Sequence, residues 1–108
     1  VISQEGELSV SFETMNAIKQ VNQDYNANLG DVVLFADAST NAVTISLPNP
    51  ANNKGKKFTI KKYDTNESHF VNVTGQIEGV SGGLYTALPY SGWNLVSDGT
   101  NWKIVEKF

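Results

Sequence analysis

The sequence predicts an all-β domain, and three observations carry this prediction. Apolar and polar residues alternate in several short runs, such as "AVTISLP" at 42–48, where Val43, Ile45 and Leu47 share one face. These runs recur at a spacing of roughly 8–12 residues, which is typical of a sandwich or small barrel. Between them lie turn-forming stretches rich in Asn, Asp, Gly and Pro, for example "NPANNKG". We therefore expect an antiparallel β-sandwich that resembles a jelly roll.

The first 24 residues follow other patterns. The run "ELSVSF" suits a short strand, because its apolar residues alternate with polar ones. In "ETMNAIKQVNQ" the apolar residues fall three apart, which predicts about two turns of amphipathic helix. We interpret residues 1–24 as a connector from a preceding stem, made of this strand and helix, and residues 25–108 as the β-sandwich knob.

Three later segments carry specific expectations. The run "DVVLFAD" at 31–37 is almost entirely apolar, which indicates a strand covered on both faces. Trp93 and Trp102 each share a face with an aliphatic residue two positions on, as core residues do. In "SDGTNW", Asp98 and Gly99 tolerate the backbone of a hairpin turn, so we expect this stretch to join two strands.

Composition excludes several classes of protein. The chain has 108 residues, enough for one domain with a thin core. It has no cysteine, which rules out disulfides and thiolate metal sites. Its net charge is −3 and it contains no arginine, so a nucleic-acid partner is not expected. No stretch approaches the ~20 apolar residues of a membrane span, so membrane insertion is not expected either.

Catalytic and metal-binding patterns are also missing from the sequence. The single histidine, His69, stands at the start of a predicted strand, and no GxSxG motif presents a serine nucleophile. The segment "DTNES" is rich in oxygen donors but lacks the spacing of a calcium-binding loop. We expect a protein that is not an enzyme, with no catalytic residue, no metal site and no cofactor.

Two pairs of residues are candidates for ligand contact. Tyr85 and Tyr90 are flanked by Gly82, Gly83 and Pro89, where exposure is expected. Aromatic rings displayed on a β scaffold can stack against the apolar faces of sugars. Asp64 and Asn66, in the "DTNES" loop, could add polar contacts.

Residues 25–108 resemble a β-domain that recurs in bacteriophage tail-fibre, neck-appendage and other virion-appendage proteins. The resemblance is carried by "NLGDVVLFADASTNAVTISLPNPANNKGKKFTIKKYD" and, after a variable stretch, by "GWNLVSDGTNWKIV". The order and spacing of these elements make the match specific, whereas each element alone is weak. The first 24 residues lie outside it.

This resemblance implies a non-enzymatic module of a virion fibre or appendage, assembled as a homotrimer. Its expected function is attachment to the host cell surface, with a surface carbohydrate or other receptor as the partner. Two alternatives stay open: a purely structural trimerisation or capping knob, and a carbohydrate-binding module of a phage depolymerase or lysin. The family has no shared ligand motif, so the resemblance assigns no binding residue.

Overall fold

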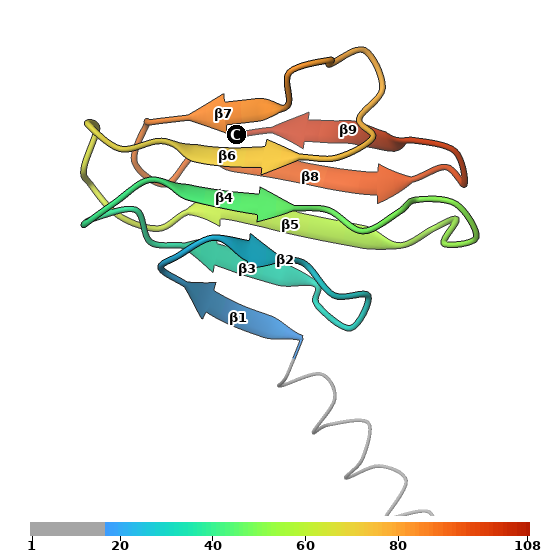
Figure 1. Cartoon of the computed structure of the whole chain (residues 1–108), viewed down its shortest axis with the longest axis horizontal. Helices are drawn as coiled ribbons and strands as arrows, with labels where there is room; N and C mark the ends of the chain where they lie inside the picture. The colour runs from blue at the N-terminus through green and yellow to red at the C-terminus, as the bar shows by residue number, and fades with distance from the viewer. Residues whose placement is uncertain (1–16) are drawn as a thin grey trace, which may run out of the picture.

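The computed structural model describes residues 17–108, which form a β-sandwich-like domain of two stacked sheets (Figure 1). Within this range every regular element is a strand, so the all-β prediction is confirmed. One sheet has the order β1-β3-β5-β8-β9 and the other β2-β4-β6-β7. The strands are β1 (Ile18–Val21), β2 (Tyr25–Asn26), β3 (Val33–Ala36), β4 (Val43–Ser46), β5 (Lys57–Lys62), β6 (Val71–Thr74), β7 (Leu84–Thr86), β8 (Gly92–Ser97) and β9 (Trp102–Lys107).

The sheets are mixed, so the expectation of an antiparallel sandwich is wrong. From β1 to β6 the chain alternates between the two layers, and strands that are neighbours in a sheet therefore run parallel. Antiparallel pairing begins only where β7, β8 and β9 join. Alternation of apolar residues reveals that one face of a strand is buried, but it does not reveal the direction of the neighbouring strand.

A helix was expected across residues 18–21, and this expectation is wrong. These residues form the edge strand β1, which pairs in parallel with β3. A helix of two turns gains little by itself, so pairing with a sheet easily overrides its propensity. In the strand, Ile18 points outward and is 53% exposed, whereas Val21 packs against the core. The predicted strand in "ELSVSF" and the start of the predicted helix lie outside the described residues.

The core lies between the two sheets. Trp102 is fully buried, its ring lies 5.2 Å from that of Phe58, and its indole N–H donates to the Pro48 carbonyl at 2.8 Å. Trp93 is 5% exposed, so the prediction that both tryptophans belong to the core is confirmed. Aliphatic side chains from both sheets complete the core: Leu34, Val43, Ile45, Ile60, Val71, Val73, Leu84 and Leu95.

Strand β3 is covered on one face only, contrary to the expectation for "DVVLFAD". Leu34 and Ala36 are fully buried, but Val33 and Phe35 lie half-buried on the outer surface of the sheet. Although nearly every residue of this run is apolar, only one face of β3 packs into the core, and the other face lies at the surface. This outer face is part of the candidate site described below.

The turn in "SDGTNW" is a hairpin, as predicted. It joins β8 to β9, with Ser97 paired to Trp102. The carboxylate of Asp98 accepts the N–H groups of Asn101 and Thr100 at 2.7 and 2.8 Å, and these hydrogen bonds lower the pKa of Asp98. Gly99 adopts a φ of 93°, which residues with a side chain rarely reach. Asp98 is therefore a turn-forming residue.

Candidate functional site

Three aromatic side chains and one lysine gather on the outer face of the five-stranded sheet. We call Phe35, Lys61, Tyr63 and Tyr90 the Tyr90 cluster. The ring centroids of Phe35 and Tyr63 are 5.1 Å apart, and those of Tyr63 and Tyr90 are 5.9 Å apart with near-perpendicular planes. The ammonium group of Lys61 lies 5.7 Å from the centroid of the Tyr90 ring. Tyr63 and Tyr90 are 46% and 49% exposed, so the cluster is open to solvent.

Strand register explains why these residues meet. Phe35 in β3 lies directly opposite Lys61 in β5, and Tyr63 follows Lys61 by two positions on the same side of the chain. On the other flank of β5, Lys61 pairs with Gly92 at the start of β8. Because Gly92 has no side chain, the ring of Tyr90, two residues earlier, can lie over this part of the sheet.

The backbone of Tyr90 is strained. Its φ is +60°, in the left-handed region that bulky residues seldom occupy. This conformation costs an L-residue roughly 1–2 kcal/mol. Strained, exposed side chains of this kind are concentrated at functional sites.

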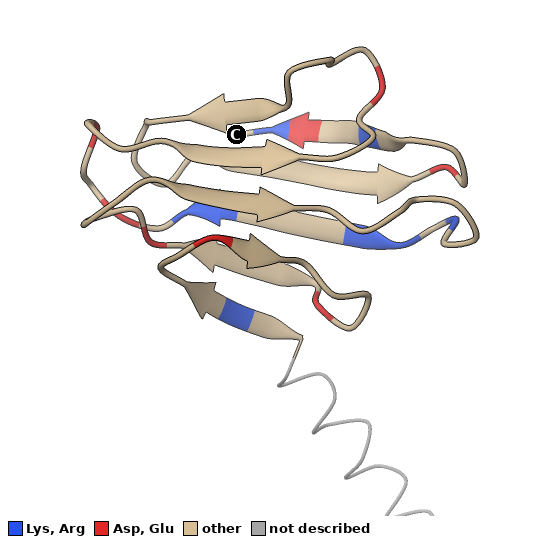
Figure 2. Ribbon diagram, viewed as in Figure 1, with Lys and Arg blue, Asp and Glu red and all other residues tan. Residues whose placement is uncertain are grey.

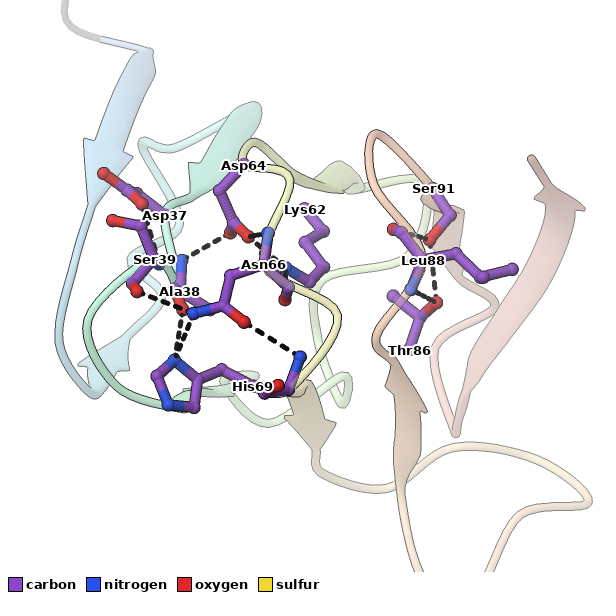
Figure 3. Close-up of polar contacts among 11 residues, drawn as sticks. Asp37, Ala38, Ser39, Lys62, Asp64, Asn66, His69, Thr86, Leu88 and Ser91 are labelled. Carbon is purple, nitrogen blue, oxygen red and sulfur yellow. Dashed lines mark hydrogen bonds and ion pairs between the residues drawn. The ribbon is translucent and has the colours of Figure 1, made fainter.

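A hydrogen-bonded turn holds Tyr90 in this conformation, as Figure 3 shows for three of its residues. The hydroxyl groups of Thr86 and Ser91 lie 2.7 Å apart, and the Ser91 hydroxyl donates to the Leu88 carbonyl at 2.7 Å. The Leu88 N–H donates to the Thr86 hydroxyl at 3.2 Å. The Lys62 N–H donates to the Ser91 carbonyl at 2.8 Å, which ties the turn to β5. The ring of Tyr90 thus projects from a loop that hydrogen bonds hold in place.

The other predicted tyrosine lies on the opposite sheet. Tyr85 points outward from β7 and is 69% exposed. Its ring packs edge-on against Phe70 with centroids 5.7 Å apart, and its register neighbour is Asn72 of β6. Both tyrosines are exposed, as expected, but the fold places them on different faces and does not bring them into one site.

Asp64 and Asn66 are occupied by contacts within the domain (Figure 3). Asp64 is only 8% exposed, and its carboxylate accepts the Ala38 N–H at 2.6 Å and the Asn66 N–H at 2.9 Å. The Asp64 carboxylate also forms an ion pair with the fully buried ammonium group of Lys62. The Asn66 amide donates to the Ser39 carbonyl at 2.9 Å. The structure thus gives both side chains an internal role, which is to hold the loop before β4 against the loop before β6.

The charge state of Asp64 follows from this network. Burial raises the pKa of Asp64, but the hydrogen bonds from Lys62, Ala38 and Asn66 outweigh burial and lower the pKa below its ordinary value. His69 joins the same network through Nδ1, which lies 2.8 Å from the Ala38 carbonyl. The same nitrogen lies 3.2 Å from the side-chain amide nitrogen of Asn66. His69 is thus half-buried against this loop.

Sequence reasoning missed three members of the Tyr90 cluster. A signal for two of them was present, because alternation along "KFTIKKY" places Lys61 and Tyr63 on the face opposite Phe58 and Ile60. The apolar run at 31–37 predicts an interior position for Phe35, so it gave no sign of a surface site. No pattern in the sequence indicated that the loop before β8 folds over β5.

Among residues 17–108, no group of three or more histidine, aspartate or glutamate side chains is arranged to hold a metal ion. The same part of the chain contains no helix with the length and hydropathy needed to cross a membrane. A comparison of the chain with family models, curated proteins and solved structures finds no match.

Proposed function

We propose that this chain is a non-enzymatic attachment module of a bacteriophage fibre or virion appendage, which binds glycans of the host cell surface through the Tyr90 cluster. The observation that carries the proposal is the conformation of Tyr90. A bulky, half-exposed residue keeps an unfavourable φ in a turn whose other contacts are satisfied. Glycine would adopt this φ at no steric cost, so the tyrosine ring itself must supply the benefit.

The cluster suits a sugar ligand. Two accessible tyrosine rings offer apolar faces and hydroxyl groups, and Lys61 adds a charged donor beside them. The braced turn fixes the ring of Tyr90 before any ligand arrives, which reduces the entropy lost on binding. A site of this size binds weakly by itself.

A homotrimer would multiply that weak binding, and we include trimeric assembly in the proposal. Linked sites raise the apparent affinity about 10²–10⁴-fold when geometry allows them to bind together. The domain supports association because it leaves large apolar side chains at the surface, including Ile18 at 53%, Leu88 at 62% and Val105 at 67% exposed. Such residues can be covered by identical neighbours.

A purely structural knob is the second candidate, and one observation favours it. A groove of about 500 Å³ runs beside β7 and the ends of β8 and β9, with Leu84, Leu88, Trp93 and Phe108 in its lining. An apolar groove at the edge of the sandwich could be filled by another subunit. A knob of this kind would need the groove and would not need the Tyr90 cluster.

The two candidates are separated by binding to an array of bacterial surface glycans. We expect the wild-type domain to bind at least one class of glycan on the array, and Tyr63→Ala and Tyr90→Ala to lose most of that signal. Tyr85→Ala is the matched control, because it removes a more exposed tyrosine from the opposite face. If wild type binds nothing, or if Tyr85→Ala is the variant that loses binding, the proposed site is wrong.

A further inference from the structure

The geometry points to a linear, negatively charged glycan as the ligand, lying along the outer face of β5 from the Tyr90 cluster toward Lys57. This inference rests on the proposed function and specifies its ligand class. The outward side chains of β5 are Lys57, Thr59 and Lys61, and Tyr63 continues the row beyond the strand. We call these four residues the β5 strip.

The strip has the dimensions of a polymer site rather than of a pocket for one sugar. Lys57 and Lys61 are four residues apart in an extended strand, so their Cα atoms are about 13 Å apart. Between them the Thr59 hydroxyl donates to the Asn94 side-chain oxygen at 2.6 Å. A hollow of about 230 Å³ adjoins the Lys57 end, and its lining includes Lys57, Thr59, Asn94 and Val105. Aromatic rings thus occupy one end of the strip and a hollow the other.

Both lysines of the strip are free to meet an anion. The charged side chains of the strands belong to β1, β5 and β9, whereas β4, β6 and β7 carry none (Figure 2). Lys103 on β9 is neutralised by Glu78 at 3.0 Å and Asp98 at 3.5 Å. Among residues 17–108, neither Lys57 nor Lys61 has a carboxylate within ion-pairing distance. Their positive charge is therefore available at the surface of a protein whose net charge is −3.

Two acidic groups lie near the strip. Glu106 accepts the Asn94 side-chain amide at 2.7 Å, beside the middle of the strip. Asp37 follows β3 and accepts the Ser39 N–H at 3.0 Å. Glu106 faces the proposed path, so its charge opposes an anionic ligand and limits the affinity.

A glycan fits these charges better than a nucleic acid does. Single-stranded nucleic acid carries a phosphate on every nucleotide, and the proteins that bind it line the path with a continuous positive groove. The β5 strip offers two cations about 13 Å apart and no arginine, which matches a polymer with sparse charges. Aromatic rings at one end suit the apolar face of a pyranose.

The test measures binding of the wild-type domain to four probes by isothermal titration calorimetry. The probes are a polysaccharide in which a uronic acid alternates with a neutral sugar, a polysaccharide in which a sugar phosphate alternates with a neutral sugar, a neutral glucan of similar length, and poly(dT). We expect binding to one or both of the first two, at least tenfold stronger than to the glucan, and weakened by added salt. The first two arms distinguish carboxylate from phosphate as the source of the charge.

Three lysine variants and one glutamate variant locate the site. We expect Lys57→Gln and Lys61→Gln each to weaken binding to the anionic polymer several-fold, and Glu106→Gln to strengthen it. Lys54→Gln is the matched control, because it changes net charge equally but its side chain lies against the 98–101 turn at Gly99. The inference is overturned if Lys54→Gln weakens binding as much as Lys61→Gln, or if poly(dT) binds most strongly. The inference is also overturned if the neutral glucan binds as strongly as the anionic polymers. If Tyr90→Ala abolished that glucan binding, the proposed function would still stand.

Discussion

At the scale of single residues, the most informative interaction is the buried pair of Lys62 and Asp64. Lys62 is fully buried and its ammonium group is satisfied by the Asp64 carboxylate and by the Asn66 carbonyl at 2.9 Å. Removing one member of a buried pair leaves the other charge without compensation, which costs about 3–5 kcal/mol. The pair therefore fixes the two loops at this end of the sandwich.

Stability should fall in acid because of two buried carboxyl groups. Burial raises the pKa of Asp31, but hydrogen bonds from Asn28, Tyr25 and Lys19 outweigh burial, so its pKa, like that of Asp64, is lowered in the folded protein. A lowered folded pKa stabilises the protein above the unfolded pKa, near 3.9, and this contribution is lost as the pH falls below that value.

We expect the urea midpoint to be steady between pH 5 and pH 7 and to drop between pH 4 and pH 2. Asp64→Asn should lower the midpoint at pH 7 by the equivalent of about 3 kcal/mol. It should also flatten the acid dependence, because one of the two groups no longer titrates. A midpoint that is the same at pH 3 and pH 7 would contradict this account of the carboxylates.

The same residues show where sequence reasoning stops. The sequence correctly predicts that "DTNES" is a polar loop. It also suggests that Asp64 and Asn66 contact a ligand, whereas the structure shows them bonded within the domain. Their partners, Ala38 and Ser39, are 26 and 27 residues away, and nothing local reveals them. For Tyr90 the sequence predicts part of the result. The neighbouring Pro89 indicates that the side chain is exposed, but no local pattern indicates the positive φ of its backbone.

At the scale of strands, β5 and β8 leave no room for a side chain at Gly92. A Cβ atom added to Gly92 would lie 2.0 Å from the Ile60 carbonyl oxygen and 2.8 Å from the Lys61 Cα. Both contacts are with backbone, so the strands would have to separate to accept a side chain. The approach also sets the position of the Tyr90 turn, which lies just before β8.

Gly92→Ala should therefore destabilise the domain by about 1–3 kcal/mol, the range found for overpacked sites. Gly82→Ala is the control, because a Cβ there meets nothing within 4 Å and the backbone is not left-handed. Chemical denaturation of the two variants checks the difference. Equal stabilities would show that β5 and β8 are not held as closely as described.

The strands also show which parts of the fold were predictable. The residues of β4, β5, β8 and β9 were identified because each has one apolar face, and the hairpin at Asp98 has a local turn signal. Strand β1 was mistaken for a helix, because its stability comes from pairing with β3 and not from its own sequence. The alternation of strands between two sheets is likewise a property of long-range pairing.

At the scale of the whole molecule, the two sheets present unlike surfaces. The outer face of β2-β4-β6-β7 is neutral and polar, with Thr44, Asn72 and Tyr85 in one row. The outer face of the other sheet carries Lys57 and the Tyr90 cluster, which includes Lys61. Only one face therefore offers both charge and stacked aromatic rings.

Trimeric assembly belongs to this scale and is tested by mass in solution. We expect light scattering to give about three times the mass of one 11.8 kDa chain. Leu88→Glu, which places a negative charge in the lining of the groove, should shift the population toward single chains. A monomeric wild-type protein at micromolar concentration would remove the trimer from the proposal and leave the Tyr90 site in place.

The central claim is that the strained backbone of Tyr90 is retained because its ring binds a ligand. One variant tests this claim most directly. In Tyr90→Gly the ring is lost and the strain is relieved, so thermal unfolding and glycan-array binding are measured on the same protein. We expect stability within about 1 kcal/mol of wild type, and higher than that of Tyr90→Ala, together with a loss of binding of tenfold or more. If Tyr90→Gly binds glycans as well as wild type, the ring is not needed for binding and the claim is wrong. If the variant unfolds as readily as a variant of a core residue, the ring stabilises the fold and the claim is also wrong.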